Sequence, residues 1–171
     1  MFPSPKIPAV IDFEASGFGS RSYPIEVGFV LPDGRLECTL IRPEPTWTHW
    51  DAPAAEVHGI TRELLMSHGK PAVHVANWLN EQLRGTTIYS DSWGHDYGWL
   101  AVLFDAANLA PSFTLEHLIC IMPECNAARW SQVHKEIELE LGLKRHRASN
   151  DALILQRTWL KLMDSNQFVM A

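Results

Sequence analysis

The chain has 171 residues, of which 46% are hydrophobic, and its formal net charge is -6. This hydrophobic fraction can form one compact core, and no linker rich in Gly, Ser or Pro divides the chain, so we expect residues 1–171 to form a single domain. The negative charge argues against a protein that coats nucleic acid with a broad basic surface. A local nucleic-acid site stays open, because metal ions can supply positive charge within a cluster of carboxylates.

Signals for a membrane or for secretion are missing from the sequence. No stretch of 18 apolar residues occurs, and the prolines among the first eight residues do not suit a signal peptide. We therefore expect a cytoplasmic protein that is not bound to a membrane. The three cysteines, Cys38, Cys120 and Cys125, contain no CxxC pair, and we expect them to be buried, reduced thiols.

The first part of the chain predicts three antiparallel strands. Residues 9–14, 25–31 and 36–41 are apolar runs, and the turn sequence Pro32-Asp33-Gly34 separates the last two. The Pro- and Trp-containing residues 43–53 predict a loop. Thr61 is then a suitable N-cap for a short helix that starts at Arg62.

Helices and one further strand alternate in the rest of the chain. Apolar residues at helical spacing predict a helix that includes Val73 and Leu83, and residues 86–90 predict a fourth strand. Further helices are predicted over residues 97–107, over residues 131–141 with Gly142 as the stop, and from Asn150, as the cap, to about residue 163. Strands joined by hairpins and followed by alternating helices and strands indicate an α/β sheet with mixed strand directions.

The first strand ends in two carboxylates. Residues two apart on a strand point to the same face, so Asp12 and Glu14 project together while Phe13 turns into the core. Such a pair is also compatible with an ordinary solvated strand end. The residues that follow favour a site, because Gly17 allows backbone to approach a ligand closely and Phe18 is able to stack on a base.

Two later segments carry further acids and a histidine. Asp96 lies near the start of the helix predicted at residue 97, where it could either cap the helix or bind a metal ion. Asp151 falls in the first turn of the last predicted helix, and His146 lies on the loop before it. The neighbouring cations Lys144, Arg145 and Arg147 are compatible with a solvated basic face or with contacts to phosphate.

Together these segments resemble the DEDDh, or DnaQ-like, family of 3′-to-5′ exonucleases. The matching motifs are Asp12-Phe13-Glu14, Asp96-Tyr97-Gly98-Trp99-Leu100 and His146-x-Ala148-x-x-Asp151-Ala152, with His58-Gly59-Ile60-Thr61 between the first two. Their order and spacing agree with the family over residues 8 to about 160. The chain departs from the family pattern at two positions: Ser92 stands where the family often has Asn, and Trp99 where it often has Phe. Both changes affect the expected fit of the terminal nucleotide and not the chemistry.

The resemblance implies a ribonuclease H-like fold with a central mixed five-stranded sheet flanked by helices. It implies two Mg²⁺ or Mn²⁺ ions as cofactors and His146 as the general base for water, since a pKa of about 6.5 leaves much of an imidazole neutral at physiological pH. The expected partner is the 3′ end of single-stranded DNA or RNA, and a homodimer is one assembly that the family allows. The implied residues are Asp12, Glu14, Asp96 and Asp151 as metal ligands and catalytic residues, His146 as a catalytic residue, and Ala15, Ser16, Gly17, Phe18, His58 and Ser92 for substrate.

Two other functions remain open on the sequence alone. One is a nucleic-acid-binding or protein-interaction module that kept the fold without catalysis, and the other is a ribonuclease H-like endonuclease or transferase. The five filled catalytic positions favour the exonuclease. Most of the seven tryptophans are expected in the core, with Trp47, Trp50 and Trp93 as candidates for exposure, and Glu26 is expected on the surface or behind the metal ligands.

Overall fold

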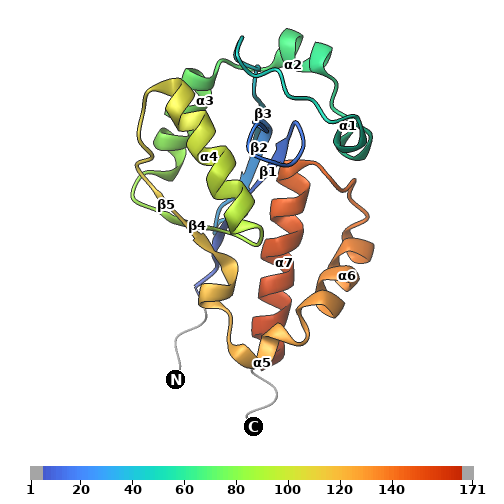
Figure 1. Ribbon diagram of the computed structural model, residues 1–171. Helices are drawn as coiled ribbons and strands as arrows, with labels where there is room; N and C mark the ends of the chain where they lie inside the picture. Colours follow the sequence, from blue (N-terminus) through green and yellow to red (C-terminus); the bar gives the residue numbers. More distant parts are fainter. Residues whose placement is uncertain (1–5, 167–171) are drawn as a thin grey trace.

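The computed structural model describes residues 6–166 and shows a five-stranded mixed sheet with strand order β3-β2-β1-β4-β5 (Figure 1). Strand β1 pairs antiparallel with β2 and parallel with β4, and these pairings confirm the predicted mixed α/β sheet. The strands are β1 (Ala9–Ala15), β2 (Pro24–Val30), β3 (Leu36–Leu40), β4 (Thr87–Ser90) and β5 (Thr114–His117).

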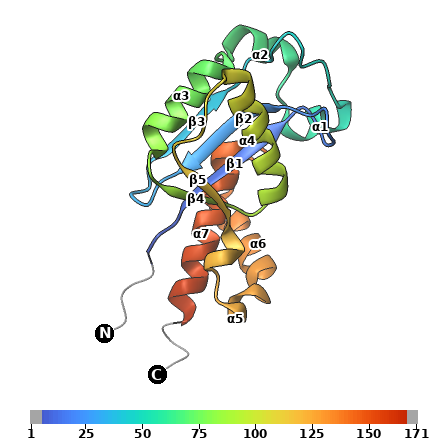
Figure 2. The same ribbon diagram turned by 60° about the vertical axis from the view of Figure 1, so that its left-hand side comes forward.

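Helices cover both faces of the sheet (Figure 2). The long helix α7 packs on β1 and β2 and carries α6 on its outer side, while α3 and α4 pack against each other on the opposite face. The helices are α1 (Ala52–His58), α2 (Arg62–His68), α3 (Ala72–Leu83), α4 (Trp93–Ala107), the 3-10 helix η1 (Leu118–Ile121), α5 (Glu124–Ala127), α6 (Trp130–Leu141) and α7 (Ala148–Asn166).

The alternation of side chains along β1 separates two cores. Ile11 and Phe13 belong to the core shared with α3 and α4, whereas Val10 belongs to the core shared with α7. The parity of the strand therefore places Asp12 and Glu14 on the α7 face, beyond the point where the apolar core ends. The prediction that Phe13 turns into the core is confirmed.

Several element boundaries differ from the sequence predictions. Helix α4 begins at Trp93, four residues before the expected start, and the elements β5, α1, η1 and α5 were not located from the sequence. The predicted capping role of Asn150 is wrong, because α7 already begins at Ala148 and the Asn150 side chain donates a hydrogen bond to the Lys144 carbonyl. Thr61 does cap α2, since its hydroxyl accepts a hydrogen bond from the Leu64 amide at 3.1 Å.

The prediction that the cysteines are buried is wrong for two of them, although both are free thiols as expected. Cys38 lies on β3 at the edge of the sheet, where its side chain faces solvent, and Cys120 is exposed in η1. The side chain of Cys125 lies outside the described part of the structure. None of the helices over residues 6–166 is long and apolar enough to span a membrane.

Helix α7 approaches the sheet closely at a single glycine. Gly28 on β2 pairs with Asp12 on β1, and a Cβ atom at position 28 would lie 2.2 Å from the Ser149 nitrogen and 2.6 Å from the Ala148 carbonyl carbon. Both of these are backbone atoms, which do not move aside as the end of a side chain does. The absence of a side chain at position 28 therefore sets how close the first turn of α7 lies to the strand pair.

Replacing Gly28 with Ala is expected to lower the free energy of unfolding by about 2–3 kcal/mol, because the first turn of α7 must shift to accept the methyl group. Urea denaturation followed by circular dichroism measures this change. Gly98→Ala is the matched control, because no atom lies within 4 Å of the added Cβ and alanine favours the α4 helix. Equal stability of the two variants would contradict the packing role of Gly28.

Candidate active site

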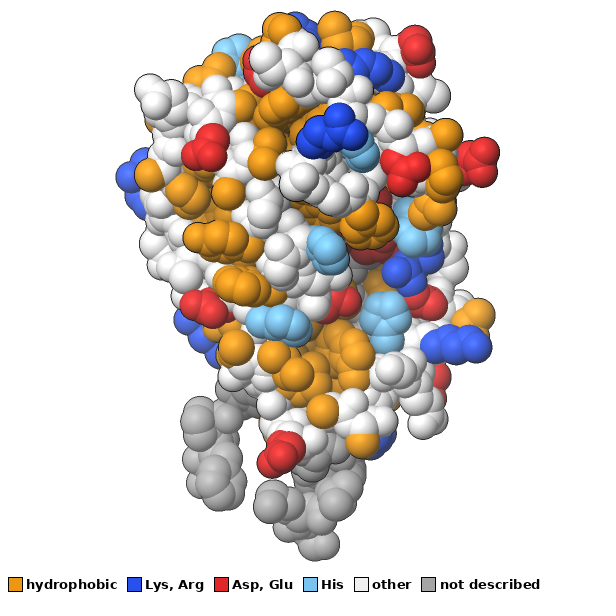
Figure 3. Space-filling view, in the orientation of Figure 1, with side chains coloured by type: hydrophobic (Ala, Val, Ile, Leu, Met, Phe, Trp, Pro, Cys, Tyr) orange, Lys and Arg blue, Asp and Glu red, His pale blue; other side chains and the backbone are white. Residues whose placement is uncertain are grey.

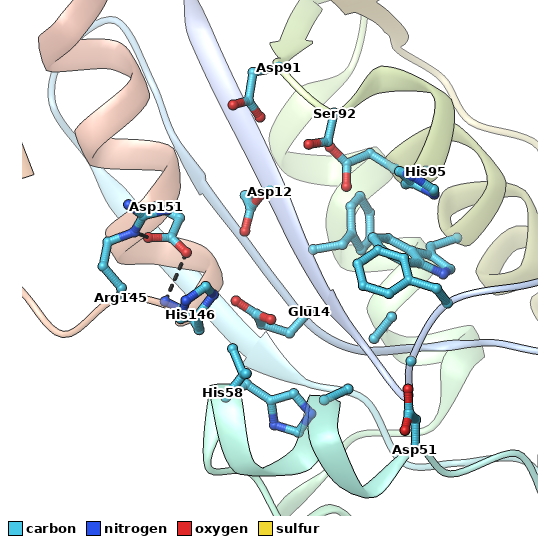
Figure 4. A pocket seen from close by; sticks show the side chains of 18 of the residues that line it. Asp12, Glu14, Asp51, His58, Asp91, Ser92, His95, Arg145, His146 and Asp151 are labelled. Atoms are coloured by element: carbon cyan, nitrogen blue, oxygen red, sulfur yellow. Dashed lines mark hydrogen bonds and ion pairs between the residues drawn. The ribbon is translucent and has the colours of Figure 1, made fainter. Parts of the chain in front are cut away.

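A cavity of about 490 Å³ opens between the C-terminal end of β1, the start of α4 and the start of α7 (Figure 4). Five of the residues that line it come from three distant segments of the chain. They are Asp12, Glu14, Asp96, His146 and Asp151. The structure thus brings together all of the residues that were predicted to be catalytic.

Strand β1 and helix α4 supply three of the carboxylates. Asp12 and Glu14 project side by side from β1, as predicted from their spacing (Figure 4). Asp96 lies in the first turn of α4 and is only 1% exposed, and neither of its carboxylate oxygens has a hydrogen-bond partner. The alternative that Asp96 caps the helix is therefore wrong, and its buried oxygens are left to face another ligand.

The fourth carboxylate and the histidine come from the start of α7. Asp151 accepts a hydrogen bond from the backbone amide of His146 at 2.9 Å and one from Nε of Arg145 at 2.6 Å. His146 itself has a φ of 59°, in the left-handed region that is uncommon for residues other than glycine. The bond from its amide to Asp151 holds this backbone conformation, which turns the imidazole over the carboxylates (Figure 4).

One close group of side chains in this cavity has the chemistry of a metal site. Ligand atoms of Glu14, His146 and Asp151 all lie within 4.8 Å of one another. Asp12 and Asp96 line the same cavity outside this close group. Four carboxylates are the hard oxygen donors that Mg²⁺ and Mn²⁺ prefer, and the unpartnered oxygens of Asp96 add free donor positions, so the residues present fit divalent cations.

Burial and mutual repulsion raise the pKa values of Asp12, Glu14 and Asp96. Burial is the main cause that raises the pKa of Glu14 to about 8, with further contributions from the charges of Asp151 and Glu26. Burial also raises the pKa of Asp12 well above its usual range, and the charge of Asp96 adds to the effect. For Asp96, burial raises the pKa to about 7, although the nearby Ser90 hydroxyl acts in the opposite direction. A cation in the cavity would relieve this repulsion.

The raised pKa of Glu14 predicts an unusual dependence of stability on pH. Between its unfolded value of 4.5 and its folded value of about 8, Glu14 binds more protons in the folded state, so its contribution to stability is lost as the pH rises through this window. In EDTA, Glu14→Gln is expected to be more stable than the parent protein by roughly 1–3 kcal/mol at pH 8.5 and nearly equal at pH 5.

Urea denaturation at the two pH values measures this difference. Glu81→Gln on α3 serves as a control, because Glu81 is exposed and its replacement removes the same charge outside the cavity. A stability gain in Glu14→Gln that is equal at both pH values would show that repulsion in the cavity is not its cause.

Most of the residues predicted to bind substrate also line the cavity. The lining set includes Ala15, Gly17, Phe18, His58 and Ser92. Ser16 is the exception, because its side chain is buried and its hydroxyl accepts a hydrogen bond from the Tyr23 amide. Gly17 approaches the chain's own loop, since a Cβ atom there would lie 2.6 Å from the Asp51 Cβ. Binding of substrate by all six residues stays a prediction.

Aromatic rings form one wall of the cavity. Phe18 is 67% exposed, and its ring lies 5.3 Å from the His95 ring and 6.2 Å from the Trp99 ring. His95 and Trp99 stack on each other at an interplanar angle of 25°. An exposed ring backed by two others is a rigid surface on which a base can stack. His95 was not singled out from the sequence, although its spacing of four residues from Trp99 on a helix would have indicated the contact.

His58 directs an unpaired nitrogen into this region. Its Nδ1 accepts a hydrogen bond from the Ile60 amide at 3.0 Å, so a neutral ring carries its proton on Nε2. Burial lowers the pKa of His58 and favours this neutral form. The Nε2 atom is buried without a protein partner, which leaves one donor at the edge of the cavity.

A buried ion pair behind the metal-ligand candidates was not foreseen. Glu26 on β2 is 1% exposed and accepts hydrogen bonds from Nε and Nη2 of Arg147 and from the backbone amide of Ala148. Glu26 thus caps the first residue of α7 from the neighbouring strand. The predicted surface position of Glu26 is wrong. A position behind the metal ligands stays a prediction, and Glu26 pairs with Glu14 across the strands. The guanidinium groups of Arg145 and Arg147 both engage carboxylates within the protein.

Neutralising this buried acid is expected to destabilise the protein. Glu26→Gln keeps the size of the side chain but removes the charge that Arg147 and the Ala148 amide require, so we expect a loss of about 2 kcal/mol. Urea denaturation at pH 7 measures this loss, with Glu81→Gln as the exposed counterpart. A loss no larger than that of the control would contradict a clamp between β2 and α7.

The sheet order and the flanking helices match a ribonuclease H-like fold. Solved structures similar to this fold include those of exonuclease I. The E. coli enzyme in complex with a dT13 oligonucleotide is 14% identical with a TM-score of 0.70, and the alignment covers 94% of this chain and 42% of that one. The zinc-bound form of the E. coli enzyme with single-stranded DNA is 16% identical with a TM-score of 0.68, at 94% and 42% coverage.

A product-bound structure of exonuclease I gives a TM-score of 0.67 at 14% identity and covers 94% of this chain and 45% of that one. The chain thus spans less than half the length of these proteins. No protein-family model matches the sequence, and no curated protein is significantly similar to it. At these identities the comparisons establish the fold, and the prediction of a ribonuclease H-like fold is confirmed.

Proposed function

We propose that this protein is a metal-dependent 3′-to-5′ exonuclease that acts on single-stranded DNA or RNA and releases nucleoside 5′-monophosphates. One observation carries the proposal: four carboxylates and one histidine from three distant segments converge on one cavity beside an exposed aromatic wall. We assign residues 1–171 to a single catalytic domain that acts in the cytoplasm, either as a monomer or as a homodimer.

The carboxylates of Asp12, Glu14, Asp96 and Asp151 are the groups assigned to hold two Mg²⁺ or Mn²⁺ ions. Two such ions supply Lewis-acid stabilisation of the attacking and leaving oxygens and favour deprotonation of a water near neutral pH. The depth of the cavity supports this assignment, because the buried Asp96 and the partly buried Glu14 carry charge only at a cost unless cations are present.

His146 is assigned as the general base. Its imidazole is exposed at the mouth of the cavity, and one ring nitrogen lies within 4.8 Å of both a Glu14 and an Asp151 oxygen. A water between these groups is in reach of the nitrogen, which accepts its proton as the oxygen attacks the terminal phosphodiester. The leaving group is the 3′ oxygen of the preceding nucleotide.

The terminal nucleotide is assigned to the side of the cavity lined by Phe18 and His58. Phe18 offers an exposed face for the base, and Nε2 of His58 offers a hydrogen-bond donor. Ser92, at the N-terminal end of α4, lines the cavity beside Asp91. The exonuclease I structures include complexes with single-stranded oligonucleotides, which supports single-stranded nucleic acid as the substrate class proposed for this chain.

The test is a digestion ladder of 5′-labelled single-stranded DNA and RNA with Mg²⁺ or Mn²⁺ and an EDTA control. Asp96→Asn is expected to lower the rate at least about 100-fold, because it removes one of the groups that stabilise charge in the transition state. The substitution keeps the size of a buried side chain that has no hydrogen-bond partner, so we expect the variant to stay folded. Asp105→Asn, at an exposed position on the same helix, is expected to keep full activity.

A ladder that shortens from the 3′ end and disappears in EDTA and in Asp96→Asn supports the exonuclease. Intact DNA and RNA with either metal ion would overturn it. Retained binding of the oligonucleotides in that case would support the alternative of a nucleic-acid-binding module without catalysis.

A further inference from the structure

A second hollow of about 270 Å³ lies next to the acidic cavity, and the proposed chemistry does not use it. We name it the side hollow; its lining is Asp91, His117, Leu118, Ile119, Met122, Ala127 and Trp130. Asp91 also lines the acidic cavity, so the two hollows meet at the end of β4. Figure 3 shows hydrophobic side chains gathered below the acidic cavity, on the same face, over the segment that leads from β5 to α6.

An aromatic ring lines the side hollow itself. Trp130 is half-buried there, and its ring lies 6.3 Å from the ring of His134, which lines the acidic cavity, at an interplanar angle of 36°. An aromatic ring in the wall of an apolar hollow is suited to planar, apolar faces such as those of nucleobases.

The lack of positive charge in the lining of the side hollow also favours contact with a base over contact with a phosphate. No Lys or Arg occurs among the described residues that line the side hollow, and Arg145, which lines the acidic cavity, is paired with Asp151. Attraction to phosphate therefore contributes little here, and stacking and apolar contact with a base remain as the source of affinity.

We propose that the side hollow binds the base of a nucleotide upstream of the cleaved bond, on the same single strand whose 3′ end enters the acidic cavity. This inference rests on the proposed exonuclease function. The strand must leave the acidic cavity on the side away from the Phe18 and His58 wall, and Asp91 connects the cavity to the side hollow on that side (Figure 4). The consequence is a substrate that needs an unpaired upstream segment as well as a free 3′ end.

Two substrates of different length separate this subsite from the catalytic cavity. The p-nitrophenyl ester of thymidine 5′-monophosphate carries one nucleotide and no upstream strand, whereas a 5′-labelled single-stranded 12-nucleotide DNA spans both hollows. Ile119→Glu places a charge at the rim of the side hollow at a position that is 56% exposed. Met66→Glu on α2, at a position that is 53% exposed, makes the same change of charge elsewhere on the surface.

The expected result is a KM for the 12-nucleotide DNA that rises about 10-fold in Ile119→Glu, with kcat/KM for the ester unchanged within about twofold. Met66→Glu is expected to match the parent protein on both substrates. This pattern would assign the upstream base to the side hollow.

Two results would overturn the subsite while leaving the exonuclease intact. One is an unchanged KM for the 12-nucleotide DNA in Ile119→Glu, equal to that of Met66→Glu. The other is an equal loss on the ester, which would place the effect in the catalytic cavity. Failure of the parent protein to hydrolyse either substrate would overturn the proposed function, and the subsite with it.

Discussion

The close contact between helix α7 and strand β2 is the constraint on which the site depends. Gly28 allows the backbone of α7 to contact the backbone of β2, and Glu26 accepts a hydrogen bond from the Ala148 amide. The same strand therefore permits the close packing of the helix and caps its N-terminus. Because β2 pairs with β1, this contact also sets how far Asp151 lies from Asp12 and Glu14. One glycine and one buried acid thereby fix the relative positions of site residues that lie more than a hundred positions apart in the sequence.

The acidic cavity forms where the two apolar cores stop. The alternation along β1 assigns Ile11 and Phe13 to one core, and the opposite face carries Val10 first and the two acids after it. The same strand therefore packs in both cores and carries the two acids. The free energy of packing on its two faces offsets the repulsion between the acids. Stability given up in this way is common at functional sites, where charge is held for chemistry and not for folding.

The sequence predicted the parts of the fold that local patterns determine. Strand β1, the turn after β2 and the Thr61 cap all follow from short-range chemistry, and the convergence of the acids followed from motif order in a known family. The start of α7 could not be predicted from local patterns, because its cap is Glu26, which is 122 residues away in sequence. Strand β5 has four residues with one buried leucine, too few to show a period, and Gly94 and Gly98 weaken the helical signal at the start of α4.

Arg145 gives the cavity a cation of its own. Its guanidinium contacts Oδ1 of Asp151 at 2.6 Å and also pairs with Glu138 on α6. A divalent ion that ligates this oxygen competes with the guanidinium, so its affinity is reduced by the ion pair that it weakens. Arg145 keeps its pair with Glu138 at the rim of the cavity, and so entry of the ion changes the charge that faces an arriving strand.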